Sequence, residues 1–105
     1  MSSSLVYVTT TNLDEAGQIG EVLVTENLAA SVNILGEVRS IYRWEESIHD
    51  RTEALLIAKT STLLVDKIIE RIRSLHSYQC PCIISWRLNA GNDAYLDWIQ
   101  REVTP

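Results

Sequence analysis

Two long β-strand patterns joined by a short turn constrain the fold of this chain more than any other feature of its sequence. Residues 30–44 and 48–60 are rich in β-branched, aromatic and aliphatic side chains, and Trp44 to Ser47 predict a hairpin turn between them. Gly36 indicates a bulge or a bend in the first strand. Strands of roughly 14 residues exceed the usual length of about 5–6, so this hairpin outruns a small sheet. We therefore expect another subunit to cover its end.

The other predicted elements alternate around this hairpin. Helices are indicated by apolar residues at intervals of three and four behind a capping side chain, and strands by β-branched or alternating apolar residues. In order along the chain, the elements are the strand 5–11, the helix from Asn12 to Asn27, the strands 30–44 and 48–60, the helix from Ser61 to Leu75, the strand 82–88 and the short helix that Asp93 caps. This β-α-β-β-α-β-α order indicates the α+β class, with a ferredoxin-like (split β-α-β) antiparallel sheet and both main helices on one face.

Length and composition predict one domain over residues 1–105. A hydrophobic content of 46% favours a compact fold over disorder. The net charge of −5, without a lysine- or arginine-rich patch, argues against nucleic-acid binding. No apolar run approaches membrane-spanning length, and the N-terminus lacks a signal-peptide pattern. We therefore expect a cytoplasmic protein without a membrane or nucleic-acid partner.

Most of the coordinating side chains fall in one short segment, from His76 to Cys82, where a helical pattern gives way to a strand pattern. An extended backbone would present the sulfurs of Cys80 and Cys82 on one face, with His76 arriving from the end of the preceding helix. Thiolates favour Cu(I) and Zn(II), so His76, Cys80 and Cys82 are candidate metal ligands. The alternative is structural: free cysteines pack as small hydrophobic side chains, and a histidine at this position caps the last helical carbonyls.

Aromatic side chains mark a second set of candidates. Tyr42 and Trp44 at the end of the hairpin and Trp98 on the last helix are candidate interface anchors, because large aromatic side chains dominate subunit contacts; the alternative is a binding surface. No catalytic triad order, glycine-rich phosphate loop or two-histidine zinc motif is present, so we do not expect an enzyme.

Six segments resemble the CutA divalent-cation-tolerance proteins, in family order and spacing and along almost the whole chain. The segments are Val6–Thr10 with Asn12, Leu28–Ile34, Ser40–Glu45, Leu55–Thr60, His76–Tyr78 with Pro81, and Gly91–Asn92 with Tyr95–Ile99. The resemblance implies a ferredoxin-like protomer in a tight homotrimer, similar to the PII-type signalling proteins, in which the hairpin extends the sheet of a neighbour. It also implies a role in tolerance of copper and other divalent metals, with no established enzymatic reaction and no obligatory cofactor.

Two hypotheses of function follow. In the first, the trimer binds copper or another metal ion. In the second, it is a PII-like sensor of a small ligand, with Trp44, Lys59, His76 and Tyr78 lining a pocket between subunits. This chain departs from the usual family pattern at Ser31, where the family has cysteine, and at Cys82, where it has glutamate, so any metal site here would use different ligands.

Overall fold

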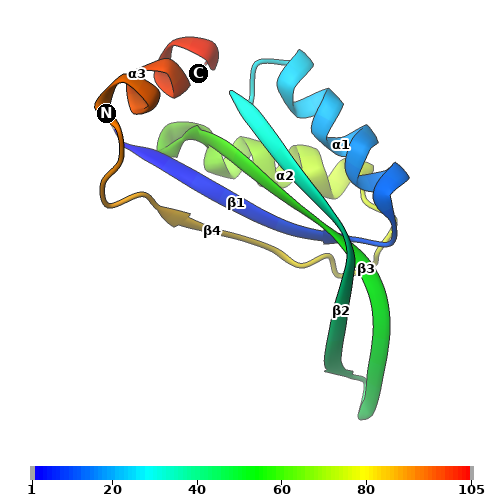
Figure 1. The fold of residues 1–105 in the computed structure, drawn as a ribbon. Coiled ribbons are helices and arrows are strands. Elements are labelled where there is room, and N and C mark those ends of the chain that lie inside the picture. Colours follow the sequence, from blue (N-terminus) through cyan, green and yellow to red (C-terminus); the bar gives the residue numbers. More distant parts are fainter. Residues whose placement is uncertain (1, 105) are drawn as a thin grey trace.

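The computed structural model describes residues 2–104, which form a four-stranded sheet with three α-helices (Figure 1). The elements are β1 (Ser3–Thr10), α1 (Leu13–Thr25), β2 (Ser31–Trp44), β3 (Ser47–Ser61), the 3-10 helix η1 (Thr62–Leu64), α2 (Val65–Leu75), β4 (Ile83–Arg87) and α3 (Asp93–Glu102). This is the predicted order, with one short 3-10 turn added before α2.

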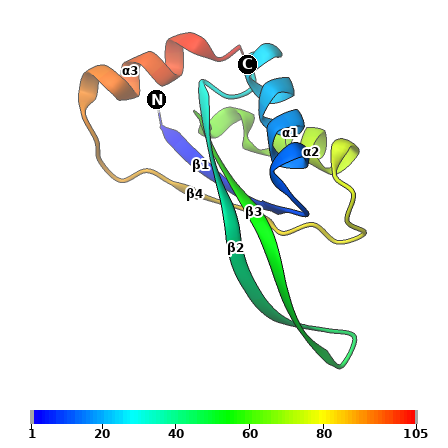
Figure 2. The same ribbon diagram turned by 45° about the vertical axis from the view of Figure 1, so that its right-hand side comes forward.

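The sheet is antiparallel throughout, in the order β2-β3-β1-β4. Because β1 lies between β3 and β4, Val6 pairs with Ala58 on one side and with Ser85 on the other. Helices α1 and α2 lie on the same face of the sheet, and α3 lies near the start of β1 (Figures 1 and 2). The predicted α+β, ferredoxin-like class is therefore confirmed.

Helix capping follows the sequence at α1 but not at α2 or α3. Ser61 caps the 3-10 helix η1, whereas α2 begins after Leu64 without a side-chain cap. Asn12 caps α1, since its side-chain oxygen accepts a hydrogen bond of 2.9 Å from the backbone N–H of Glu15. At α3 the prediction of Asp93 as the cap was wrong: Asn92 accepts the hydrogen bond from the N–H of Ala94, at 3.1 Å. Asp93 instead occupies the first turn, where the helix dipole favours a carboxylate.

The predicted irregularity at Gly36 is a bulge, and the register of β2 against β3 shifts between Leu35 and Val38. The left-handed residue of the bulge is Glu37, with φ of 56°. At Gly36, a Cβ atom would lie 3.1 Å from the side chain of Leu13, which is a tight contact. The missing Cβ therefore leaves room for the Leu13 side chain of α1 where the hairpin bends.

Beyond the bulge the hairpin leaves the sheet. Residues 54–61 of β3 pair with β1, but the half of β3 before Ala54 has β2 as its only neighbour in the register. The two strands project past the rest of the molecule (Figure 2). Glu45 and Glu46 form the two-residue turn with φ of 49° and 67°, the left-handed pair that a type I′ hairpin requires. Ile41 and Ile48 near this turn are 61% and 60% exposed, so the projecting end presents apolar surface.

The two sheet faces differ in what covers them. On the helix-covered face, side chains such as Val6, Val8 and Leu56 are fully buried. On the other face, Tyr7 is partly exposed and its β4 partner Ile84 is 54% exposed. The result is an uncovered apolar sheet face in a single chain. No helix within residues 2–104 combines the length and apolarity needed to cross a membrane.

Adjacent leucines in η1 provide a test of this core. Leu64 is 2% exposed and Leu63 is 71% exposed. We expect Leu64→Ala to lower the free energy of unfolding by about 2–5 kcal/mol, because it leaves a cavity, and Leu63→Ala to change it by less than about 0.5 kcal/mol. Urea denaturation at one fixed protein concentration measures both. Equal losses would contradict this assignment of the buried face.

Candidate functional site

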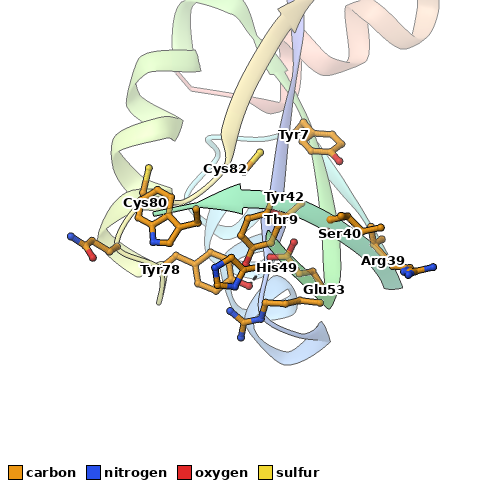
Figure 3. Close-up of a pocket in the computed structure, with 15 residues that line it drawn as sticks. Tyr7, Thr9, Arg39, Ser40, Tyr42, His49, Glu53, Tyr78, Cys80 and Cys82 are labelled. Carbon is orange, nitrogen blue, oxygen red and sulfur yellow. Dashed lines mark hydrogen bonds between the residues drawn. The ribbon is translucent and has the colours of Figure 1, made fainter. Parts of the chain in front are cut away.

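A pocket lies between the hairpin and the segment that precedes β4 (Figure 3). Its volume is about 650 Å³. One wall comes from the part of the hairpin beyond the bulge and the other from residues 78–82, while Tyr7 and Thr9 of β1 contribute to the lining. The pocket therefore forms where the hairpin departs from the sheet.

Thr9 holds both ends of the segment from His76 to Cys82. Its carbonyl oxygen lies 2.7 Å from Nε2 of His76, and its N–H donates to the carbonyl of Cys82 at 3.4 Å. The N–H of Ser77 donates to the Glu15 carboxylate at 2.8 Å, which ties the segment to helix α1. These contacts place residues 78–82 along the pocket.

His76 is a structural residue in this protomer. Its side chain has no exposed surface, and its Nδ1 accepts a hydrogen bond of 3.1 Å from the N–H of Tyr78. Since the Thr9 carbonyl can only accept, Nε2 is the nitrogen that donates, so one neutral tautomer satisfies both contacts. Both ring nitrogens are thus engaged. Within residues 2–104, no three His, Cys, Asp or Glu side chains are grouped so that they could hold a metal ion.

Glu15 supports the same segment. Burial alone would raise the pKa of its carboxyl, but hydrogen bonds from Ser77 and from the N–H of Thr11 outweigh this cost and hold the pKa below its ordinary value. The ionised carboxylate accepts from two backbone N–H groups and so joins the start of α1 to the end of α2.

Tyr78 ties the wall formed by residues 78–82 to the hairpin. Its hydroxyl donates to Oε2 of Glu53 at 2.6 Å, and Glu53 is only 6% exposed. Burial of the phenol and the adjacent Glu53 raise the pKa of Tyr78 to about 12. Tyr78 therefore keeps its proton at neutral pH, when it serves as a hydrogen-bond donor.

Cys80 and Cys82 are the reactive groups that the structure leaves free. Both thiols are unpaired and both residues are exposed and line the pocket. The sequence placed Cys82 in the last strand, but β4 begins at Ile83, so both cysteines lie in the connecting segment. Within this single chain they are not buried among core side chains.

The hairpin wall contains Tyr42, which the sequence suggested as an interface anchor, and His49 and Arg51, which it did not suggest as site residues. The rings of Tyr42 and His49 stack with centroids 5.2 Å apart, and Arg51 lines the same wall. Arg39 forms a two-point ion pair with Asp50, with N–O distances of 3.0 and 2.7 Å. His49, Arg51 and Glu53 alternate along β3 and so share one strand face. This alternation of polar side chains was the sequence signal that could have indicated the pocket wall.

Two predicted site residues lie elsewhere. Lys59 pairs with Leu5 and Ser31 at the opposite end of the sheet, and its amine contacts the side chain of Asn33, so it does not line this pocket. Trp98 packs against the core and lies 5.4 Å from Tyr95 between ring centroids. Trp44, by contrast, lines the pocket and is 42% exposed.

Comparison with known proteins identifies the family. The family model described as "CutA1 divalent ion tolerance protein" matches residues 4–102. The chain belongs to this family. The divalent-cation tolerance protein CutA of Thermus thermophilus is 40% identical over 96 residues, which cover 91% of this chain and 93% of that relative. Its solved structure has a TM-score of 0.94 at 37% identity and covers 97% of this chain and 99% of that chain.

Other family members come from different compartments. A chloroplastic CutA protein of Arabidopsis thaliana is 36% identical over 98 residues, and the match spans 93% of this chain but only 54% of the plant protein. A CutA structure from Archaeoglobus fulgidus, described as periplasmic, has a TM-score of 0.94 at 33% identity and covers 97% of this chain and 99% of that chain. The family therefore does not by itself fix a cellular location.

The Tyr78–Glu53 contact generates a prediction. We expect Tyr78→Phe to lower the free energy of unfolding by about 1–3 kcal/mol, because the buried Glu53 loses its donor. The pKa of Tyr78 is raised from 10.0 to about 12, so the wild type should lose stability as pH rises from 10 towards 12, and the variant should lack this component. Urea denaturation across this pH range measures both effects.

Tyr95→Phe is the matched control, since Tyr95 is 41% exposed. It should change stability little and keep the alkaline loss. An alkaline loss of equal size in the Tyr78→Phe variant would show that another group titrates.

Proposed function

We propose that this protein contributes to tolerance of divalent metals, copper among them, by binding metal ions as a cytoplasmic homotrimer. Membership of the divalent-cation-tolerance family supports the physiological role. The observation that carries the proposed mechanism is the pair of free, exposed thiols on the pocket wall, Cys80 and Cys82. Free thiols also favour a reducing compartment such as the cytoplasm.

Two surfaces of the single chain support assembly. The sheet face opposite the helices is apolar and uncovered, with Trp86 and Ile84 at 45% and 54% exposure. The projecting hairpin adds Ile41 and Trp44 at 61% and 42% exposure. Burying such surface between copies would add stability that one small core cannot supply. A PII-like trimer, in which each hairpin extends a neighbouring sheet, would cover both surfaces.

A catalytic role is not part of this proposal. Tyr78 has a raised pKa of about 12 and is hydrogen-bonded to Glu53, so it is poorly suited to proton transfer at neutral pH. Both nitrogens of His76 are engaged by the backbone. These two groups of the family-like motif act in this protomer as anchors.

The second candidate function is a small-ligand sensor, and the hairpin wall is the observation that favours it. The Tyr42–His49 stack offers an aromatic surface, and Arg51 adds a cation in the same pocket. A volume of about 650 Å³ suits a small molecule. In this second function, the pocket would bind a small anion, and the trimer would signal the bound state to a partner protein.

If the protein is a homotrimer, its molar mass in solution is that of three chains. We expect multi-angle light scattering at micromolar concentration to give three times the 11.9 kDa of the chain. A charged substitution on the uncovered sheet face, Ile84→Lys, should dissociate the trimer and lower the melting temperature, whereas Leu63→Lys outside that face should do neither. A folded wild-type monomer would contradict the proposal.

Metal binding is tested by competition against a Cu(I) chelator under reducing, anaerobic conditions. We expect the parent protein to withdraw copper from the chelator and the Cys80→Ser/Cys82→Ser variant to lose this ability while keeping its mass and circular dichroism. Failure of the parent to withdraw copper, together with binding of a small anion that survives in the double variant, would favour the sensor instead.

A further inference from the structure

The pocket between the hairpin and the segment before β4 gathers aromatic side chains. The chain has four tyrosines and three tryptophans, and four of these seven residues line the pocket: Tyr7, Tyr42, Trp44 and Tyr78 (Figure 3). Small-molecule sites are typically lined by aromatic and apolar side chains, with a few polar groups that orient the ligand. The polar groups of this pocket therefore indicate which class of molecule it would bind.

Strand register brings the side chains of the hairpin wall into one row. Tyr42 pairs with His49, and Ser40 pairs with Arg51. Directly paired residues share a sheet face, and Arg51 is the diagonal neighbour of Tyr42 on that face. The Tyr42 and His49 rings are nearly parallel, with an angle of 12° between them and centroids 5.2 Å apart. The row thus presents a flat aromatic surface with a guanidinium beside it.

Arg51 is the cation of this pocket that is not held by a carboxylate. Arg39 also lines the pocket, but Asp50 accepts two hydrogen bonds from its guanidinium. In the part of the chain that the structure describes, no carboxylate forms an ion pair with Arg51. Arg51 is exposed, and the Tyr42 hydroxyl beside it raises the pKa of the guanidinium. Arg51 can therefore bind a ligand carboxylate through two parallel hydrogen bonds.

Glu53 limits the negative charge that the pocket accepts. It follows Arg51 by two positions on β3, lines the same pocket and is only 6% exposed. Its carboxylate accepts the hydrogen bond from Tyr78 at 2.6 Å. A ligand with several negative charges would meet one cation without an ion pair and would be repelled by Glu53. A single carboxylate therefore fits the pocket better than a polyphosphate does.

We propose that this pocket binds a small aromatic monocarboxylate, whose ring stacks against Tyr42 and His49 and whose carboxylate pairs with Arg51. The inference rests on the second candidate function, the small-ligand sensor, and names the class of its ligand. The pocket volume of about 650 Å³ accommodates an acid with one ring or two fused rings. Metal binding by the thiols is a separate proposal and has its own test.

The experiment is calorimetric titration of the full-length protein near neutral pH with four probes. Benzoate carries both features, cyclohexanecarboxylate lacks the aromatic ring, benzamide lacks the charge, and pyrophosphate has several charges and no ring. We expect one benzoate per chain, bound about three- to tenfold more tightly than cyclohexanecarboxylate because of ring stacking. Benzoate should bind about tenfold or more tightly than benzamide or pyrophosphate.

Variants of the cation test the assigned carboxylate contact. Arg51→Gln should weaken benzoate binding about tenfold or more, and Arg51→Lys should weaken it less, because lysine keeps the charge and loses the planar fork. Arg73→Gln is the matched control, since the Arg73 side chain on α2 is 63% exposed and does not line the pocket. It should keep the parent affinity. Equal affinity of the parent and Arg51→Gln for benzoate would overturn the inference.

The probes separate failure of the ligand class from failure of the sensor function. Cyclohexanecarboxylate or pyrophosphate bound as tightly as benzoate would overturn the aromatic monocarboxylate and leave a small-anion sensor standing. Benzamide bound as tightly as benzoate would overturn the role of Arg51. No binding of any probe would overturn both this inference and the sensor function.

Discussion

The pairing of β2 with β3 is the interaction on which the rest of this structure depends. One half of β3 also pairs with β1 and so carries the sheet under helices α1 and α2. The other half, before Ala54, pairs with β2 alone and forms the hairpin wall of the pocket. The bulge at Gly36 and Glu37 separates the two halves. The paired strands β2 and β3 thus contribute to the hydrophobic core at one end and form a wall of the pocket at the other.

The second constraint is the polar network around the segment from His76 to Cys82. Its members come from distant parts of the chain: Thr9 from β1, Glu15 from α1 and Glu53 from β3. The Thr9 and Glu53 contacts satisfy partly buried donors that would otherwise be costly to remove from water, and the Glu15 contact with the N–H of Ser77 is exposed. Because the network occupies His76 and Tyr78 structurally, it leaves the two thiols as the free chemistry of the segment. Within this segment, the motif residues His76 and Tyr78 are held by hydrogen bonds, and the two thiols are not.

The two positions at which this chain departs from the usual family pattern lie in different parts of the structure. Ser31, at the position of the usual family cysteine, begins β2 opposite Lys59 and is not part of the pocket. Cys82, at the position of the usual glutamate, lines the pocket beside Cys80. The two free thiols of this chain thus lie at the end of the sheet where the hairpin departs.

The sequence alone determined the element order, because strand alternation and helical spacing are local properties. Asn12 caps α1 as expected and Gly36 marked the bulge, but Ser61 caps the 3-10 helix η1 and not α2. The local pattern could not distinguish which of two adjacent capping residues begins the last helix. The sequence therefore predicted Asp93 as the cap, whereas Asn92 is the cap in the structure.

Only the tertiary structure decided which candidate side chains are taken up by hydrogen bonds within the protomer and which line the pocket. His76 looked like a ligand, but its partner Thr9 is 67 positions away and takes up its Nε2. Lys59 was grouped with Trp44 in a pocket between subunits; within one chain, strand register puts Lys59 opposite Ser31, away from the pocket that Trp44 lines. The buried Glu53 and the stacked His49 became site residues only when the hairpin met the segment before β4. Hydrogen-bond partners and strand register join residues that are far apart in the sequence. The spacing of residues along the chain therefore does not predict them.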